Sequence, residues 1–351
     1  MLFVANALIP TLQLSFLKPL AALIDAGDIA VELLSEQQLK ECFGNDPRSA
    51  AASAWLGDRF KRFRPTTLIF CRYSGPGAEH LMALAGAIGI PTVFHIDDDL
   101  LNVPREIGQK KFEFHNHPTR QATVRHLLAN VDLVYCSTEA LRRRFLSYGY
   151  DRRYYVGNIY CAGTVMGEPV AGNATRIGYM GFDHAHDFEL VLPALIEVMR
   201  LCPEVVFELF GAIPKPPMLD EFADRVVLIP PVPNYGEFMA KLASRRWAVG
   251  ICPLAKTIFN EVKANTKWVE YTSVGAAAIA SRDTVYNDCC GDGRGWLVDT
   301  KAEWREALLA LISDETLRLA QIRSAQATLR EDYSVSGLRD QVLQVLAIAR
   351  S

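Results

Sequence analysis

Short apolar runs alternate with amphipathic stretches along almost the whole chain, and this pattern constrains the fold more than any other feature of the sequence. Apolar runs of strand length at 66–70, 91–96 and 131–136 are separated by stretches with helical periodicity at 78–89 and 117–129. Such an alternation is typical of βα units that feed a parallel sheet. The sequence therefore predicts an α/β fold, with a further helix at 15–26.

The alternation stops at 158–174, where glycines and a proline occur without periodicity, and we predict a linker there. A second βα series follows, with strands expected at 176–181, 205–210, 226–229, 248–252 and 276–281, and helices at 187–201, 235–244, 266–273, 301–312, 314–329 and 335–350. We expect two Rossmann-like, doubly wound domains at 1–165 and 175–330, with 331–351 packing back on the first. Because such sheets bind ligands at the carboxyl ends of their strands, the cleft between the domains is the predicted site.

Composition narrows the class of protein. The chain has 351 residues, half of them apolar, and 37 basic against 40 acidic residues give a net charge of −3, which argues against a nucleic-acid partner. Eight scattered cysteines without a C-x-x-C motif indicate reduced thiols. No apolar stretch reaches the roughly 18 residues of a membrane span, and the N-terminus lacks a basic leader region. We expect a cytoplasmic protein, and a peripheral contact with the inner face of a membrane stays open.

The most specific motif is FNEVKANTKWVEY at 259–271. Lys263 and Lys267 precede and open the predicted helix 266–273, where their charges and the amides of the helix N-terminus can bind a diphosphate. Glu270 follows Lys267 by three residues, so both lie on one helical face, and its carboxylate can accept two hydrogen bonds from a ribose diol. The alternative is that Lys267 and Glu270 form a solvated pair on the helix surface.

This segment resembles the motif F-N-x-x-K-x-x-x-K-x-x-E-Y of family 4 glycosyltransferases, which are retaining enzymes of the GT-B fold. The resemblance implies that Glu270 holds the donor ribose and that Lys263 and Lys267 hold the diphosphate and support catalysis. The better-known family pattern has two glutamates eight positions apart, but the position eight before Glu270 is Val262. We therefore expect Asn260 or Glu261 to contact the donor sugar instead.

A second stretch, GYMGFDHAHDF at 178–188, is similar to the first strand and loop of the family's C-terminal half. The resemblance implies that Gly181 admits the phosphates and that the next helix, capped by Asp187, directs its N-terminus at them. His184 or His186 could donate to the donor, and Gly211, after the next strand, is also assigned to donor binding. The histidines and aspartates would also suit a metal, but GT-B enzymes do not need one and no third cluster lies nearby, so we expect no metal and no cofactor.

An acidic turn follows the predicted strand 91–96, and it resembles a turn found in the N-terminal half of many bacterial members. Asp97 or Asp98 is expected to contact the acceptor or the transferred sugar in the cleft. The alternative is that these aspartates cap the next helix or turn. A D-x-D metal motif is disfavoured because it belongs to a one-domain architecture. After the strand 131–136, Ser137 is the expected helix N-cap.

Basic residues gather in the first half at 142–144, 152–153 and 110–111, with Arg105 nearby. Such runs are usually solvated helix faces. The alternative is a docking patch for an anionic lipid or glycan acceptor, which Phe112, Phe114 and Tyr148 would help to engage.

Together with the family resemblance, these features predict a glycosyltransferase of the bacterial surface-glycan type, which moves a hexosyl or deoxyhexosyl group from a nucleotide diphosphate-sugar to a glycan or lipid-linked acceptor. Retention of the anomeric configuration is implied by the resemblance alone. The alternative is a non-catalytic GT-B subunit that binds glycans or acts as a scaffold, since the first glutamate is missing. A solute-binding protein would need an export signal. A dinucleotide dehydrogenase would need a G-x-G-x-x-G after a strand, and none occurs.

Overall fold

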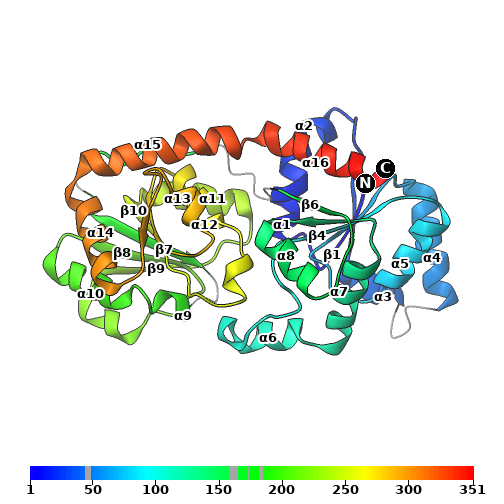
Figure 1. The fold of residues 1–351 in the computed structure, drawn as a ribbon, viewed down its shortest axis with the longest axis horizontal. Helices are drawn as coiled ribbons and strands as arrows, with labels where there is room; N and C mark the ends of the chain where they lie inside the picture. The colour runs from blue at the N-terminus through cyan, green and yellow to red at the C-terminus, as the bar shows by residue number, and fades with distance from the viewer. Residues whose placement is uncertain (44–48, 158–164, 173, 182–184) are drawn as a thin grey trace.

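Two six-stranded parallel sheets form the two halves of the computed structural model, which describes residues 1–43, 49–157, 165–172, 174–181 and 185–351 (Figure 1). Helices surround each sheet, and the two halves lie side by side along the long axis of the molecule. The predicted architecture of two Rossmann-like, doubly wound halves is confirmed.

The first sheet has the strand order β2-β1-β3-β4-β5-β6, and every neighbouring pair is parallel. Its strands are β1 (Leu2–Ala5), β2 (Glu32–Ser35), β3 (Leu68–Cys71), β4 (Thr92–Ile96), β5 (Leu133–Cys136) and β6 (Tyr154–Val156). The helical segments are α1 (Pro10–Leu12), the π-helix η1 (Gln13–Leu17), α2 (Lys18–Asp25), α3 (Glu36–Phe43), α4 (Ala50–Phe63), α5 (Ala78–Ala87), η2 (Arg105–Ile107), α6 (Gln109–His115), α7 (Pro118–Asn130) and α8 (Glu139–Ser147).

The second sheet has the order β12-β11-β10-β7-β8-β9 and is also parallel throughout. Its strands are β7 (Arg176–Gly181), β8 (Val206–Gly211), β9 (Val226–Ile229), β10 (Val249–Cys252), β11 (Ala277–Ser281) and β12 (Trp296–Val298). The helical segments are α9 (Ala185–Phe188), α10 (Leu192–Leu201), η3 (Pro217–Arg225), α11 (Tyr235–Arg245), η4 (Asn260–Val262), α12 (Thr266–Ser273), α13 (Asn287–Cys290), α14 (Lys301–Ser313), α15 (Glu315–Asp332) and α16 (Val335–Arg350).

Burial explains which strands the sequence predicted. The central strands β3, β4, β5, β10 and β11 are buried at every residue, so they appear in the sequence as continuous apolar runs, and all five were predicted. Strand β1 is buried at every residue too, but it was not predicted. The short strands β2, β6 and β12 lie at sheet edges, are only half-buried and were not predicted. Of the predicted linker, 165–172 has no helix or strand, whereas 158–164 and 173 lie outside the described residues.

One predicted helix start is wrong by one residue. Helix α8 begins at Glu139 and its N-cap is Thr138, whose hydroxyl accepts a hydrogen bond from the amide of Leu141. Ser137 instead directs its hydroxyl to the backbone oxygen of Asp97 at 3.4 Å. Ser137 therefore ties the end of β5 to the end of β4, so that the helix starts one residue later than expected.

The last two helices link the halves (Figure 1). Helix α15 packs on α12 and α14 in the second half, and α16 then packs on α2, η1 and β5 in the first. Val342, Val345, Leu346 and Ala349 of α16 share a buried cluster with Met1 and other residues of the first half. No helix in the described part of the chain has the length and apolarity that a bilayer span requires.

Each sheet reverses its direction of winding at one point. In the second sheet the reversal lies between β7 and β10, and the order β9-β8-β7-β10-β11-β12 is that of a Rossmann fold. In the first sheet the reversal lies between β1 and β3. Loops diverge at such a point and leave a crevice at the carboxyl ends of the strands, which is where a ligand site is expected.

Candidate active site

A cavity of about 390 Å³ lies between the two halves, and it receives residues from both. The loops after β1, β3 and β4 supply its first wall, and the loops after β7, β8 and β10, with α12, supply the second. The two points of reversal therefore face the same space. Polar residues that line it include Arg72, Asp97, Asp98, Lys263, Lys267 and Glu270.

The Tyr271 hydroxyl lies between strands β7 and β10, at the point where the second sheet reverses its direction of winding. Strands β7 and β10 pair only at two positions, and beyond them the Tyr271 hydroxyl accepts from the amide of Met180 and donates to the carbonyl of Ile251. The ring fits because position 250 is glycine, where an added Cβ would lie 2.5 Å from it. This insertion fixes α12 against the strand ends and so places Glu270, its neighbour in the chain, at the cavity.

Glu270 is buried, with an exposed fraction of 7%, so the alternative of a solvated pair with Lys267 is contradicted. Its Oε1 accepts from the Tyr235 hydroxyl at 3.0 Å. Burial raises the pKa of Glu270 to about 7, although the hydrogen bond from Tyr235 and the charge of Lys267 favour ionisation. A carboxylate held in this way can accept hydrogen bonds from a ligand diol.

The two lysines of the motif approach aromatic rings. The Lys263 Nζ lies 5.0 Å from the centre of the Phe259 ring, and the Lys267 Nζ lies 5.8 Å from that of Tyr179. Burial lowers the pKa of Lys263 to about 8, against the opposing charge of Asp98. Neither lysine forms an ion pair with a carboxylate among the described residues. Because Lys263 and Lys267 form no ion pair with a carboxylate among the described residues, their charges in one cavity can attract an anionic ligand.

Arg72 connects the aspartates of the first half. Its Nη1 forms ion pairs with the Asp97 carboxylate and, at 2.8 Å, with Asp98 Oδ2, while the Thr11 hydroxyl donates to Asp97 at 3.1 Å. Burial opposes the ionisation of Asp98, but the charges of Arg72 and Lys263 hold its pKa below the usual range. Arg72 has a φ of 47°, a strained value for a residue other than glycine.

Asp99 caps the turn after β4, which is the alternative role considered for the aspartates of this segment. Its Oδ1 accepts from the amide of Leu101 at 3.2 Å and its Oδ2 from the Tyr148 hydroxyl at 2.6 Å. Asp97 and Asp98, in contrast, line the cavity. Arg72 was missed by the sequence analysis, although it lies two residues beyond the predicted strand 66–70 and therefore at the same sheet edge.

Comparison with known proteins identifies the fold. No protein-family model and no curated protein match the sequence. Anabaena HepE in complex with UDP-glucose is similar in structure with a TM-score of 0.65 and 14% identity over 99% of both chains. A UDP-forming trehalose-phosphate synthase from Burkholderia xenovorans gives 0.65 and 13% over 100% of this chain and 99% of that chain. The chain has the GT-B fold.

A third GT-B neighbour, an E. coli trehalose-6-phosphate structure with bound UDP-2-fluoro glucose, has a TM-score of 0.62 and 16% identity over 98% of both chains. At these identities the likeness shows the fold alone. The roles of individual residues in this GT-B chain therefore depend on its own geometry.

Asp187 is not the helix cap that was expected at the start of the second GT-B half. It lies inside the short helix α9, and α10 begins only at Leu192. Its buried carboxylate accepts from the amide of Ala255 at 2.8 Å and from Asn260 Nδ2 at 3.2 Å, and pairs with His186 at 3.2 Å. The side chain therefore anchors the loop after β10, because a buried carboxylate needs several donors.

The remaining predicted donor residues fall into three groups: two line the cavity, two do not, and one lies outside the described residues. Gly181 and Gly211 line the cavity, and Gly211 has a φ of +130° with its missing Cβ only 2.0 Å from the Gly181 carbonyl. Asn260 is buried against Asp187, and Glu261 pairs with Arg144 at 3.1 Å, so neither lines the cavity. His184 lies outside the described residues. Within those residues, no three potential ligand side chains gather as a metal site.

An apolar wall of the cavity was not predicted. It consists of Phe210 at the end of β8, the loop 231–233, and Tyr235 and Phe238 of α11. The ring centres of Phe210 and Phe238 are 5.1 Å apart, and those of Tyr235 and Phe238 are 5.8 Å apart. The available signal was the P-P-V-P-N-Y run directly after a predicted strand. This wall offers an aromatic and apolar surface beside Glu270.

Most basic residues of the first half have internal partners. Arg142 pairs with Glu139 at 2.5 Å, Arg152 donates to the carbonyl of Ala129 at 2.5 Å, and Arg153 donates to the carbonyl of Ile348 at 2.9 Å. Arg105 stacks on Phe112. Lys111 lines the cavity. These contacts favour structural roles for the arginine runs, and a membrane or glycan docking patch stays a prediction.

Proposed function

We propose that this chain is a glycosyltransferase that moves a sugar from a nucleotide diphosphate-sugar to a glycan or lipid-linked acceptor. The observation that carries the proposal is the convergence of Lys263, Lys267 and buried Glu270 on one interdomain cavity, opposite Asp97 and Asp98. Two neighbours of the same fold support it, since they bind UDP-glucose and UDP-2-fluoro glucose.

Each part of such a donor has a counterpart in the cavity. The apolar wall with Tyr235 would take the base, and Glu270 would accept hydrogen bonds from the ribose diol. Lys263 and Lys267 would bind the diphosphate. The transferred sugar would then lie toward Asp98, which Arg72 holds, so that the first half contacts the sugar in place of the missing glutamate.

We further propose that transfer retains the anomeric configuration. The bond between the anomeric carbon and the diphosphate oxygen breaks, the acceptor oxygen bonds to that carbon on the same face, and the acceptor proton passes to the departing diphosphate. Lys263 and Lys267 stabilise the charge on that diphosphate as it leaves. Because side chains supply this charge, we expect turnover to persist in EDTA.

A nucleotide panel tests the proposal. Thermal unfolding is followed with UDP, GDP, dTDP and CMP and with their sugar conjugates, since a ligand that binds the folded state raises the midpoint. Release of sugar from the conjugate that binds is then measured. A shift followed by turnover supports the enzyme. Binding without turnover would favour the non-catalytic subunit, and no shift with any nucleotide would contradict the donor site.

A further inference from the structure

The segment between β10 and α12 belongs to the second half by sequence, but its middle is buried in the core of the first half. Phe259 is 5% exposed and Val262 is 1% exposed, and both pack in the cluster that contains Leu141 and Phe145 of α8. We call residues 259–262 the plug. It is the short turn η4 with the residue before it.

Polar contacts hold the plug to helix α8. The Thr138 hydroxyl donates to the carbonyl of Val262 at 2.9 Å, and Arg144 Nη2 donates to Glu261 Oε2 at 3.1 Å. Thr138 is the N-cap of α8, so it joins the start of this helix to the plug. Apolar burial and directed hydrogen bonds thus fix Phe259, Glu261 and Val262 to the first half, whereas the Asn260 side chain donates to Asp187 of the second half.

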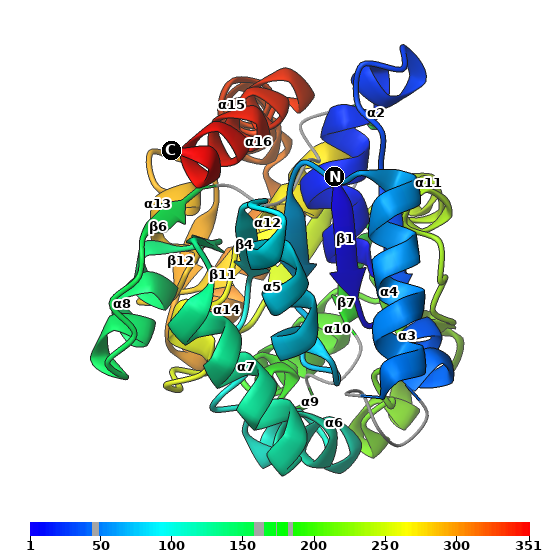
Figure 2. The same cartoon turned by 90° about the vertical axis from the view of Figure 1, so that its right-hand side faces the viewer.

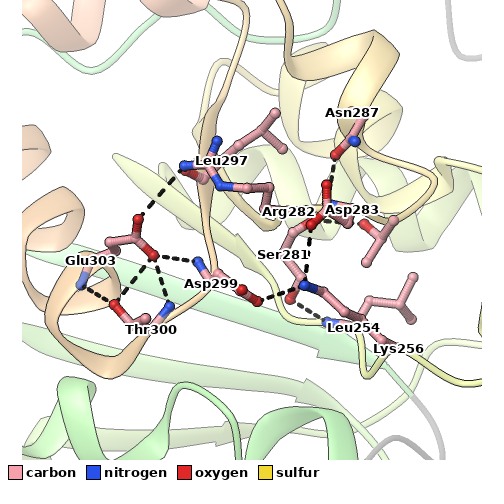
Figure 3. A network of polar contacts seen from close by, with 11 residues as sticks. Leu254, Lys256, Ser281, Arg282, Asp283, Asn287, Leu297, Asp299, Thr300 and Glu303 are labelled. Carbon is pink, nitrogen blue, oxygen red and sulfur yellow. Dashed lines mark hydrogen bonds and ion pairs between the residues drawn. The ribbon is translucent and has the colours of Figure 1, made fainter.

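The beginning of the same loop is fixed to the second half (Figure 3). The amide of Leu254 donates to the Ser281 hydroxyl at 2.9 Å, and Lys256 pairs with Asp283 at 3.3 Å and Asp299 at 2.9 Å. The amide of Ala255 donates to buried Asp187. The loop therefore starts on one half and is inserted in the other.

Lys263 directly follows the plug, and this distinguishes it from the other cation of the site. Its ammonium lies beside the ring of Phe259, a plug residue, and shares the cavity with Asp98 of the first half. Lys267 and Glu270 lie on α12, which packs on β10, β11 and α15 of the second half. Contacts with the first half therefore position Lys263, and contacts within the second half position Lys267.

We propose that the plug positions Lys263 against the leaving diphosphate, with Val262 as a positioning residue that acts through this lysine. The inference rests on the proposed function. This role also explains why position 262 is a valine. The side chain is buried in the core of the first half instead of facing the donor. Contact between the halves then determines whether Lys263 is in place to bind the diphosphate and to stabilise its charge as it leaves.

The test compares Val262→Ala with Val124→Ala. Val124 lies on α7, is 1% exposed and belongs to the same buried cluster, so both variants remove the same methyl groups from one core. Release of glucose from UDP-glucose to water is measured, together with UDP affinity by calorimetry. We expect kcat to fall roughly 10- to 100-fold in Val262→Ala, because small displacements of a catalytic group are costly. UDP should also bind more weakly to Val262→Ala, because the displaced lysine contacts the diphosphate, whereas Val124→Ala should keep the wild-type kcat and UDP affinity within about twofold.

A second pair of variants leaves the core intact. Thr138→Val removes the hydrogen bond to Val262 and should lower both kcat and UDP affinity, whereas Thr138→Ser retains the hydroxyl and should keep the wild-type values. If the wild type turns over UDP-glucose but Val262→Ala and Thr138→Val match Val124→Ala in kcat, the plug inference is overturned alone. If another nucleotide of the panel binds, the same variants are compared with its sugar conjugate. If the wild type binds no nucleotide of the panel and turns over none of the conjugates, the proposed function fails and the inference fails with it.

Discussion

Replacing Glu270 with glutamine should stabilise the unliganded protein and weaken nucleotide binding at the same time. Glutamine keeps the shape of the side chain and can still accept from the Tyr235 hydroxyl, but it removes the charge. That charge is costly because the carboxyl is buried, and burial raises its pKa from 4.5 to about 7. The same charge is what a ribose diol would bind.

The stability effect follows from linkage. Because the pKa of Glu270 is raised in the folded state, the folded protein binds more protons than the unfolded chain between pH 4.5 and about 7. The free energy of unfolding therefore decreases as pH rises through this range and is lowest above it. The difference in pKa corresponds to roughly 3 kcal/mol. Glu270→Gln avoids this cost, so it should be more stable than the wild type at pH 8 by up to about 3 kcal/mol and nearly equal to it at pH 4.5.

The affinity effect has the opposite sign. A hydrogen bond to a charged group contributes about 1 kcal/mol more than one to a neutral group. Two ribose hydroxyls would then lose about 2 kcal/mol, or roughly 30-fold in the Kd for UDP at pH 8. At pH 6 the Glu270 carboxyl is mostly protonated, so wild-type affinity should itself be lower and the difference should shrink to a few-fold.

Urea unfolding and calorimetric titration with UDP, each at pH 6 and pH 8, measure both effects. The expected pattern is a variant that is more stable and binds UDP more weakly at pH 8, with both differences smaller at pH 6. A variant that is less stable than the wild type at pH 8 would refute the argument from burial. An unchanged Kd at pH 8 would refute the assignment of Glu270 to the ribose.

Three further substitutions test other parts of the molecule. Lys267→Met should raise the Kd for UDP about tenfold or more through loss of a charged contact, whereas binding of uridine, which has no phosphates, should not change in the same titration. Asp98→Asn should lower kcat for UDP-glucose and leave UDP affinity unchanged, because Asp98 and its partner Arg72 lie on the half opposite the nucleotide; a change in affinity alone would contradict this placement. Glu208→Gln should lower the free energy of unfolding by about 3 kcal/mol, because the fully buried carboxylate of Glu208 accepts hydrogen bonds from Arg245 and Trp247. A urea midpoint equal to that of the wild type would show that the charge of Glu208 contributes nothing to stability.

The local part of the candidate site was predictable. Helix α12 has the predicted bounds 266–273, and its polar face carries Lys267 and Glu270 one turn apart. The acidic turn after β4 was also placed at the cavity, because a residue after a buried parallel strand must lie at the carboxyl edge of the sheet.

Contacts between distant residues were not predictable in the same way. The sequence analysis assigned Asn260 and Glu261 to the sugar and Asp187 to a helix cap. In the structure, Asp187 accepts from Asn260 across 73 positions, and Glu261 pairs with Arg144 across 117 positions. Each residue has a partner that only the folded chain brings near, and these partners direct Asn260 and Glu261 away from the cavity.

The sequence by itself determined two parallel-sheet halves, an interdomain site and the shared helical face of Lys267 and Glu270, because these depend on local periodicity and spacing. Only the tertiary structure decided that Arg72 joins the two aspartates, that an apolar wall lies beside Glu270, and that Val262 is buried in the opposite half. The physical reason is that packing between the halves depends on surfaces built from many separate segments. The bond from Thr138 to Val262, which spans 124 positions, has no local pattern that predicts it.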